Sequence, residues 1–170
     1  SFHHWMAQLE AEHHNLLAAL EWLLAQDDAE LGLRLVAALR DFWIMSNRFI
    51  EGGYWTEAAL TKIETAAPAL RAKIYIAIGY IGYYASRGEA RIQASQRLQD
   101  AARIAGEINE HGLRAWALIL FGAYSIGQPE GYEPALKSAE QGVDLFRALD
   151  DKEGLAQGLC IVGELARTHD

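Results

Sequence analysis

Apolar residues recur along almost the whole chain at spacings of three and four positions, the pattern of amphipathic helices. The strict alternation of apolar and polar residues that is typical of strands is absent. Glycine, asparagine, proline and paired aspartates interrupt the pattern and mark helix ends. The pattern predicts eight helices, at residues 5–26, 29–46, 50–65, 69–86, 89–109, 112–127, 131–149 and 152–168.

Short polar segments separate these helices. Asp27-Asp28 is expected to end one helix and cap the next, because Asp favours helix N-termini. Asn47 is expected to end the second helix, and Asp150-Asp151 to precede the eighth. Because every connection is short, consecutive helices are expected to run antiparallel.

Two ladders of small and apolar residues repeat with a period of about 40 residues. Three helices carry the first ladder with identical internal spacing: Ile78, Ile81, Gly82 and Ala85; Leu118, Phe121, Gly122 and Ser125; and Leu159, Val162, Gly163 and Ala166. Three partner helices carry the second: Gly52, Thr56 and Ala59; Ala94, Leu98 and Ala101; and Ala135, Ala139 and Gly142.

The ladders have a physical reading. A small residue at the centre of a helix lets two backbones approach closely, and larger apolar neighbours fill the groove around it. One helix pair cannot bury its apolar face alone, so pairs stack into a continuous core. The alternative is that the repeated spacing arises by coincidence among alanine-rich helices. The two ladders are in register with each other, which argues against coincidence. The sequence therefore predicts an all-α α-solenoid of antiparallel helix pairs, with residues 1–170 as a single domain.

On these ladder residues, the chain resembles the tetratricopeptide repeat family over roughly residues 30–170. The period of about 40 residues is longer than the usual 34 of that family. Arg40 stands where the first repeat should have a small residue. Long helices of this kind are similar to the repeats of large bacterial regulators.

The amino end carries a more specific resemblance. The residues concerned are Leu9-Glu-Ala-Glu-His-His-Asn-Leu-Leu-Ala-Ala-Leu-Glu-Trp22, Leu31-Gly-Leu-Arg-Leu-Val-Ala-Ala-Leu39, Phe42-Trp43, Phe49, Glu51-Gly52 and Trp55. This segment looks like the one that follows the nucleotide-binding and winged-helix domains of bacterial signal-transduction ATPases. Those ATPases include LuxR-type and antibiotic-regulatory-type transcriptional regulators.

The resemblance implies that residues 1–28 are the family's amino-terminal helix and that residues 29–170 are stacked repeats. It also implies a sensor and autoinhibitory arm, with the ATPase and DNA-binding domains elsewhere in a longer protein. The first residue is Ser1 and not methionine, which fits a piece of such a protein.

Charge and cysteine content narrow the partners and the compartment. The formal net charge is −8, and binding to a phosphate backbone needs clustered Lys and Arg, so we expect no contact with nucleic acid. A single cysteine, Cys160, has no partner for an internal disulfide, which suits a reducing cytoplasm. No uncharged run reaches the roughly 20 residues of a membrane span.

Candidate chemistry is sparse. His3, His4, His13 and His14 lie near Glu10, but adjacent histidines point about 100° apart on a helix and chelate poorly. Cys160 lies among apolar residues, so a buried and inert thiol is expected. There is no phosphate-binding Gly-Lys-Ser/Thr motif and no Gly-x-Ser-x-Gly nucleophile elbow. We therefore expect no catalytic residue, no metal and no cofactor.

Aromatic residues are concentrated in two of the predicted helices. Core packing is expected for Trp43 and Tyr84, since aromatic side chains bury the most area. The remaining aromatics cannot all face inward, because small and aliphatic residues already occupy the stacking face. Some are expected on a solvent-facing surface, where exposed aromatic patches usually bind a partner.

Projection of the tetratricopeptide register places the first helix of each pair on a concave face. The candidate groove residues are Arg34, Asp41, Met45, Ile76, Tyr83, Arg87, Trp116, Ile119, Gln157 and Glu164. A merely solvated inner face is the alternative reading of these positions. The expected function is non-catalytic: a protein-binding or intramolecular sensor arm of a bacterial transcriptional regulator. A pocket for a small-molecule inducer is the second hypothesis.

Overall fold

The computed structural model describes residues 2–85, 89–125 and 131–167, and within these ranges it contains only helices. They are α1 (Phe2–Ala11), α2 (His13–Leu24), α3 (Glu30–Met45), α4 (Phe49–Leu60), the 3-10 helix η1 (Ile63–Thr65), α5 (Pro68–Ala85), α6 (Glu89–Glu107), α7 (His111–Ser125), α8 (Tyr132–Ala148) and α9 (Lys152–Arg167). The all-α prediction is confirmed for the described part of the chain.

Two predicted helices have different bounds. The expected helix 5–26 bends at Glu12 into α1 and α2, which turns His13 toward Glu51 of α4. The expected helix 50–65 ends at Leu60 and continues only as η1. Here the Thr61 and Thr65 hydroxyls donate to the carbonyls of the residues three positions earlier, at 2.8 and 3.0 Å. Such side-chain bonds compete with the helical ladder and favour its end.

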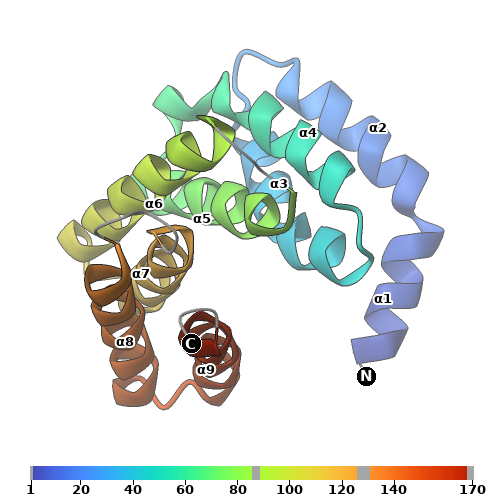
Figure 1. Ribbon diagram of the computed structural model, residues 1–170. Helices are drawn as coiled ribbons and strands as arrows, with labels where there is room; N and C mark the ends of the chain where they lie inside the picture. Colours follow the sequence, from blue (N-terminus) through green and yellow to red (C-terminus); the bar gives the residue numbers. More distant parts are fainter. Residues whose placement is uncertain (1, 86–88, 126–130, 168–170) are drawn as a thin grey trace.

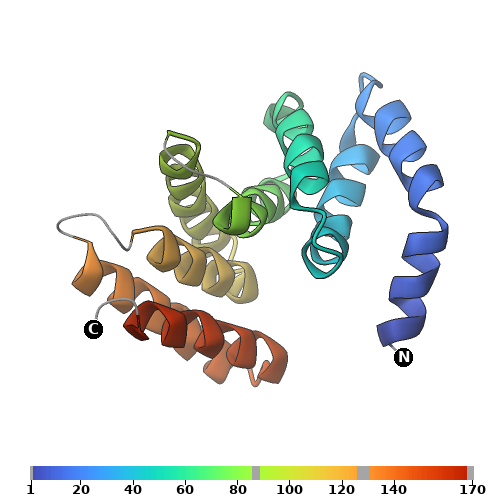
Figure 2. The same ribbon diagram turned by 45° about the vertical axis from the view of Figure 1, so that its right-hand side comes forward.

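The helices form a row that bends into an arc, with α3, α5, α7 and α9 on the inner side and α4, α6 and α8 on the outer side (Figures 1 and 2). Each helix from α3 onward packs on its neighbours in the chain. The inner helices also pack on one another, α3 on α5, α5 on α7 and α7 on α9. One set of helices therefore lines the whole concave face.

Three of the helices end in the same way. Asn47, Asn109 and Asp150, after α3, α6 and α8, have φ values of 56°, 58° and 53°. Asn and Asp tolerate this left-handed conformation better than other side chains do. In each case the following N–H donates to the carbonyl five residues earlier, as Arg48 does to Trp43 at 2.8 Å. The predicted stop at Asn47 is confirmed, and Asp150-Asp151 directly precedes α9 as expected.

The small-residue ladder of α4, α6 and α8 lies at the helix contacts. All nine of its positions are buried, and its side chains are at most 1% exposed. A Cβ at Gly122 of α7 would lie 2.5 Å from the backbone oxygen of Ala135 on α8. A Cβ at Gly142 of α8 would lie 2.6 Å from the backbone oxygen of Ala115 on α7. Backbone atoms of α7 and α8 therefore approach too closely for any side chain at these two points.

The corresponding face of α9 is different. Gly163 is exposed, and a Cβ there would meet nothing within 4 Å, although Gly122 is its equivalent in the ladder. Leu159 is 48% exposed and Cys160 is exposed, so the expectation of a buried thiol is wrong. The cause is that α9 packs chiefly on α7 and α8, and none of the described helices covers its remaining face.

Adding one methyl group should have opposite effects at the two glycines. Gly122→Ala should lower the free energy of unfolding by about 1–3 kcal/mol, because the new Cβ overlaps a backbone oxygen. Gly163→Ala is the control and should raise it by about 0.5–1 kcal/mol, because alanine is the better helix former and has room. Urea denaturation measures both. Equal effects would show that α7 and α8 do not meet at Gly122.

Candidate functional site

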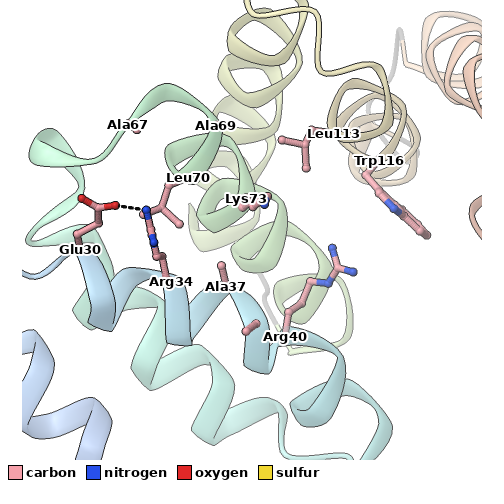
Figure 3. A pocket seen from close by; sticks show the side chains of 11 residues that line it. Glu30, Arg34, Ala37, Arg40, Ala67, Ala69, Leu70, Lys73, Leu113 and Trp116 are labelled. Carbon is pink, nitrogen blue, oxygen red and sulfur yellow. Dashed lines mark ion pairs between the residues drawn. The ribbon is translucent and has the colours of Figure 1, made fainter. Parts of the chain in front are cut away.

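The concave face is hollowed between α3, α5 and α7 by a cavity of about 600 Å³ (Figure 3). Four of the residues that line the cavity are alanines and leave it open: two on α3, one just before α5 and one in the first turn of α5. Apolar surface from Leu70, Leu113 and Trp116 completes its walls. The other lining residues are charged: Glu30, Arg34, Arg40 and Lys73.

The two arginines of α3 are held by acidic neighbours. Arg34 forms an ion pair with Glu30, one helical turn away (Figure 3). Arg40 donates from Nε to Asp41 at 2.7 Å. The exposed Lys73 of α5 has no ion pair with any carboxylate of the described residues. The rim therefore carries more positive than negative charge.

Arg40 also contacts aromatic rings on two neighbouring helices. Its guanidinium carbon lies 5.8 Å from the ring centroid of Tyr80 on α5 and 5.8 Å from that of Trp116 on α7. The Trp116 ring packs in turn against Phe146 of α8, with centroids 5.2 Å apart. Arg40, which interrupts the small-residue pattern in the sequence, thus joins three inner elements by cation–π contacts.

A second, smaller hollow of about 150 Å³ extends the face toward α9. It shares Arg40 and Trp116 with the larger cavity and adds Asp41 of α3 and Gln157 of α9. Further carboxylates, from Asp151 and Glu153, also line it. The concave face is therefore continuous from α3 to α9, more basic at the first hollow and more acidic at the second.

Tyrosines at the far end of α5 extend the face. Burial, reinforced by the neighbouring Tyr84, raises the pKa of Tyr80 to about 12. Burial also raises the pKa of Tyr83, and the carboxylate of Glu164 on α9 adds to this. Both phenols therefore remain neutral at physiological pH. Tyr84 is 54% exposed and stacks on Phe49 at 5.0 Å, so the expectation that it belongs to the core is wrong.

The structure sorts the ten sequence-predicted groove residues into four groups. Arg34, Asp41, Met45 and Glu164 are exposed on inner helices. Tyr83, Trp116 and Gln157 are partly buried there. Ile76 and Ile119 are fully buried, so their assignment to the groove is wrong. Arg87 lies outside the described residues.

Both misassigned isoleucines lie in the core instead of the groove. Ile119 of α7 packs against Gly142 of α8 and Gly158 of α9. The residues that the sequence reasoning missed are Arg40, Lys73 and Tyr80. For the two cations a signal was present in the helical spacing: Arg40 follows Ala37 and Lys73 follows Ala69 on the same helix faces.

The amino-terminal histidines have other contacts. The Glu51 carboxylate accepts a hydrogen bond from Trp43 Nε1 at 2.9 Å and contacts His13 Nε2 at 2.9 Å. Glu10 pairs with Arg48 at 2.9 Å. These contacts tie α1 and α2 to α3 and α4. Across the described residues, no three His, Cys, Asp or Glu side chains are grouped so that they could hold a metal ion.

Comparison of the chain with protein-family models, with curated proteins and with solved structures finds no match. In the described part of the chain, no helix combines the length and the apolar character needed to cross a membrane.

Tyr80 should give the protein a pH-dependent stability at alkaline pH. Its pKa rises from 10.0 to about 12 on folding, so its contribution is fully present below pH 10.0 and is lost as the pH rises through about 12. Tyr80→Phe should therefore flatten the decline in unfolding free energy between pH 10 and 12, measured by urea denaturation.

Tyr54→Phe is the matched control for this measurement, because Tyr54 is 67% exposed. It should keep the slope of the wild type. A Tyr80→Phe variant with an unchanged slope would mean that the phenol is not desolvated in the folded state.

Proposed function

We propose that this chain is a tetratricopeptide-like α-solenoid that binds a partner on its concave face and does no chemistry itself. The chain would be the sensor arm of a bacterial transcriptional regulator of the LuxR or antibiotic-regulatory type. Such a regulator takes part in signal transduction in the cytoplasm. The partner is another protein or another domain of the same chain. Nucleic acid is not a partner of this segment.

The observation that carries the proposal is the composition of the concave face. Exposed side chains of both charge signs and partly buried aromatics lie together on α3, α5, α7 and α9: Arg34, Asp41, Met45, Tyr83, Trp116, Gln157 and Glu164. Aromatic and arginine side chains dominate the binding energy of protein interfaces. Such a mixture along one side of a row of helices favours a surface that binds a partner.

The acidic balance of the chain supports the exclusion of nucleic acid, because a net charge of −8 repels a phosphate backbone. The small-residue ladders and the resemblance of residues 9–55 to the segment beside the nucleotide-binding domains support the regulator assignment.

A small-molecule inducer is the second candidate occupant. The observation in its favour is the cavity of about 600 Å³ at α3, α5 and α7, since ligand pockets commonly enclose about 300–1,000 Å³. Both occupants would use the same concave face, and the two functions are compatible in one sensor arm.

Site-specific photocrosslinking tests partner binding. The photoreactive amino acid p-benzoylphenylalanine replaces Met45 or Gln157 on the concave face, in cells that make the whole protein. We expect each of these positions to give a discrete crosslinked species, between proteins or within the chain. Asp100 of α6, exposed on the outer row, is the control and should give none.

Equal crosslinking from the inner and outer positions would contradict the proposal. So would crosslinking from Asp100 alone, since the binding surface would then lie on the convex side.

A further inference from the structure

We propose that the cavity between α3, α5 and α7 is a binding site for a small organic anion with an apolar body and a carboxylate, sulfonate or phosphate head. This inference rests on the proposed function, because it uses the same concave face. It adds the charge and the shape of the ligand, which the proposed function leaves open.

The charge of the lining points to an anion. Three of its residues are cationic, Arg34, Arg40 and Lys73, and one is a carboxylate, Glu30. This excess of positive charge occurs in a chain whose net charge is −8, so it is a local feature of the site. A concave surface with an excess of one sign of charge raises the local concentration of ligands of the opposite sign.

The arrangement of the cations leaves donors for a ligand. Asp41 takes the Nε–H of Arg40, and the guanidinium extends toward Trp116 across the space between α3 and α7 (Figure 3). Lys73 lies on the intervening helix, α5, without a carboxylate partner among the described residues. Both cations are therefore available to the head group of one anion, which arginine and lysine bind through charge-assisted hydrogen bonds.

The remaining walls point to an apolar body on that anion. Alanines and the side chains of Leu70, Leu113 and Trp116 supply most of the surface, and the volume is about 600 Å³. A bare inorganic ion would leave this apolar surface and most of the volume in contact with water. A planar ring against Trp116 would fill it, because aromatic rings favour stacked or edge-to-face contact.

Two fluorescent probes with the same ring system separate charge from apolar attraction. They are 8-anilinonaphthalene-1-sulfonate, which has the anionic head, and N-phenyl-1-naphthylamine, which lacks it. We expect the sulfonate to bind the chain about tenfold more tightly than the neutral probe, the effect of one charge-assisted hydrogen bond. Its affinity should fall as salt screens the exposed cations.

Three variants locate the binding. Lys73→Gln and Arg40→Gln together should remove the tenfold preference for the sulfonate and leave the affinity for the neutral probe unchanged. Ala38→Trp keeps every charge but fills the cavity, so it should abolish binding of both probes. Arg103→Gln removes an exposed cation of α6 outside the cavity and should change nothing.

The proposal is overturned if the two probes bind equally, since apolar contact alone would then explain the binding. It is also overturned if Lys73→Gln with Arg40→Gln behaves like Arg103→Gln, or if Ala38→Trp still binds, because the probe would then sit elsewhere. Neither Met45 nor Gln157 lines this cavity, so the crosslinking result is independent. Probe binding without crosslinking would sustain the anion site and contradict the protein partner.

Discussion

Backbone atoms of α7 and α8 meet at Gly122 and Gly142 with no room for a Cβ. At each point the nearest obstacle is a carbonyl oxygen of the facing helix, which cannot move aside as a flexible side chain could. The buried alanines at Ala135 and Ala139 continue the same close contact along α8. This approach fixes the position of α8 against its inner partner α7.

The concave face depends on that geometry. Because α4, α6 and α8 present small residues to the inner row, the bulky apolar side chains of the inner helices fill the contacts, as Ile76 and Ile119 do when they are fully buried. The opposite sides of α3, α5 and α7 are left free to carry charge. Alanines at Ala37 and Ala38 then leave a cavity beside Arg40 where larger residues would have closed it.

Local signals in the sequence were enough to predict the helices and many of their ends. Asn47 and Asp150 act through their own backbone conformation, which depends little on the rest of the chain. The second ladder was predictable as well, because a periodic row of small residues has few uses other than close helix packing. Gly122 fits the predicted crossing for the same reason.

Exposure was harder to predict, because it depends on helices far away in the sequence. The motif at Gly163 matches that at Gly122, yet only Gly122 has a described helix packed against it. Adjacent helical positions differ by about 100°, so a small error of register moves a side chain such as Ile119 from groove to core. The helical spacing places Arg40 on the same face as Ala37, but its contacts with Tyr80 and Trp116, two side chains on other helices, could not be read from any local pattern.

The central claim is that the glycine contact between α7 and α8 sets the position of α8 against the inner row. A distance measurement by pulsed electron spin resonance tests it, with spin labels on cysteines at the exposed positions Asp41 of α3 and Asp144 of α8, and with the exposed Cys160 replaced by serine. The account predicts one narrow distance distribution, which shifts when Gly122 is changed to alanine and stays fixed when Gly163 is changed to alanine. An identical distribution in both variants would contradict it.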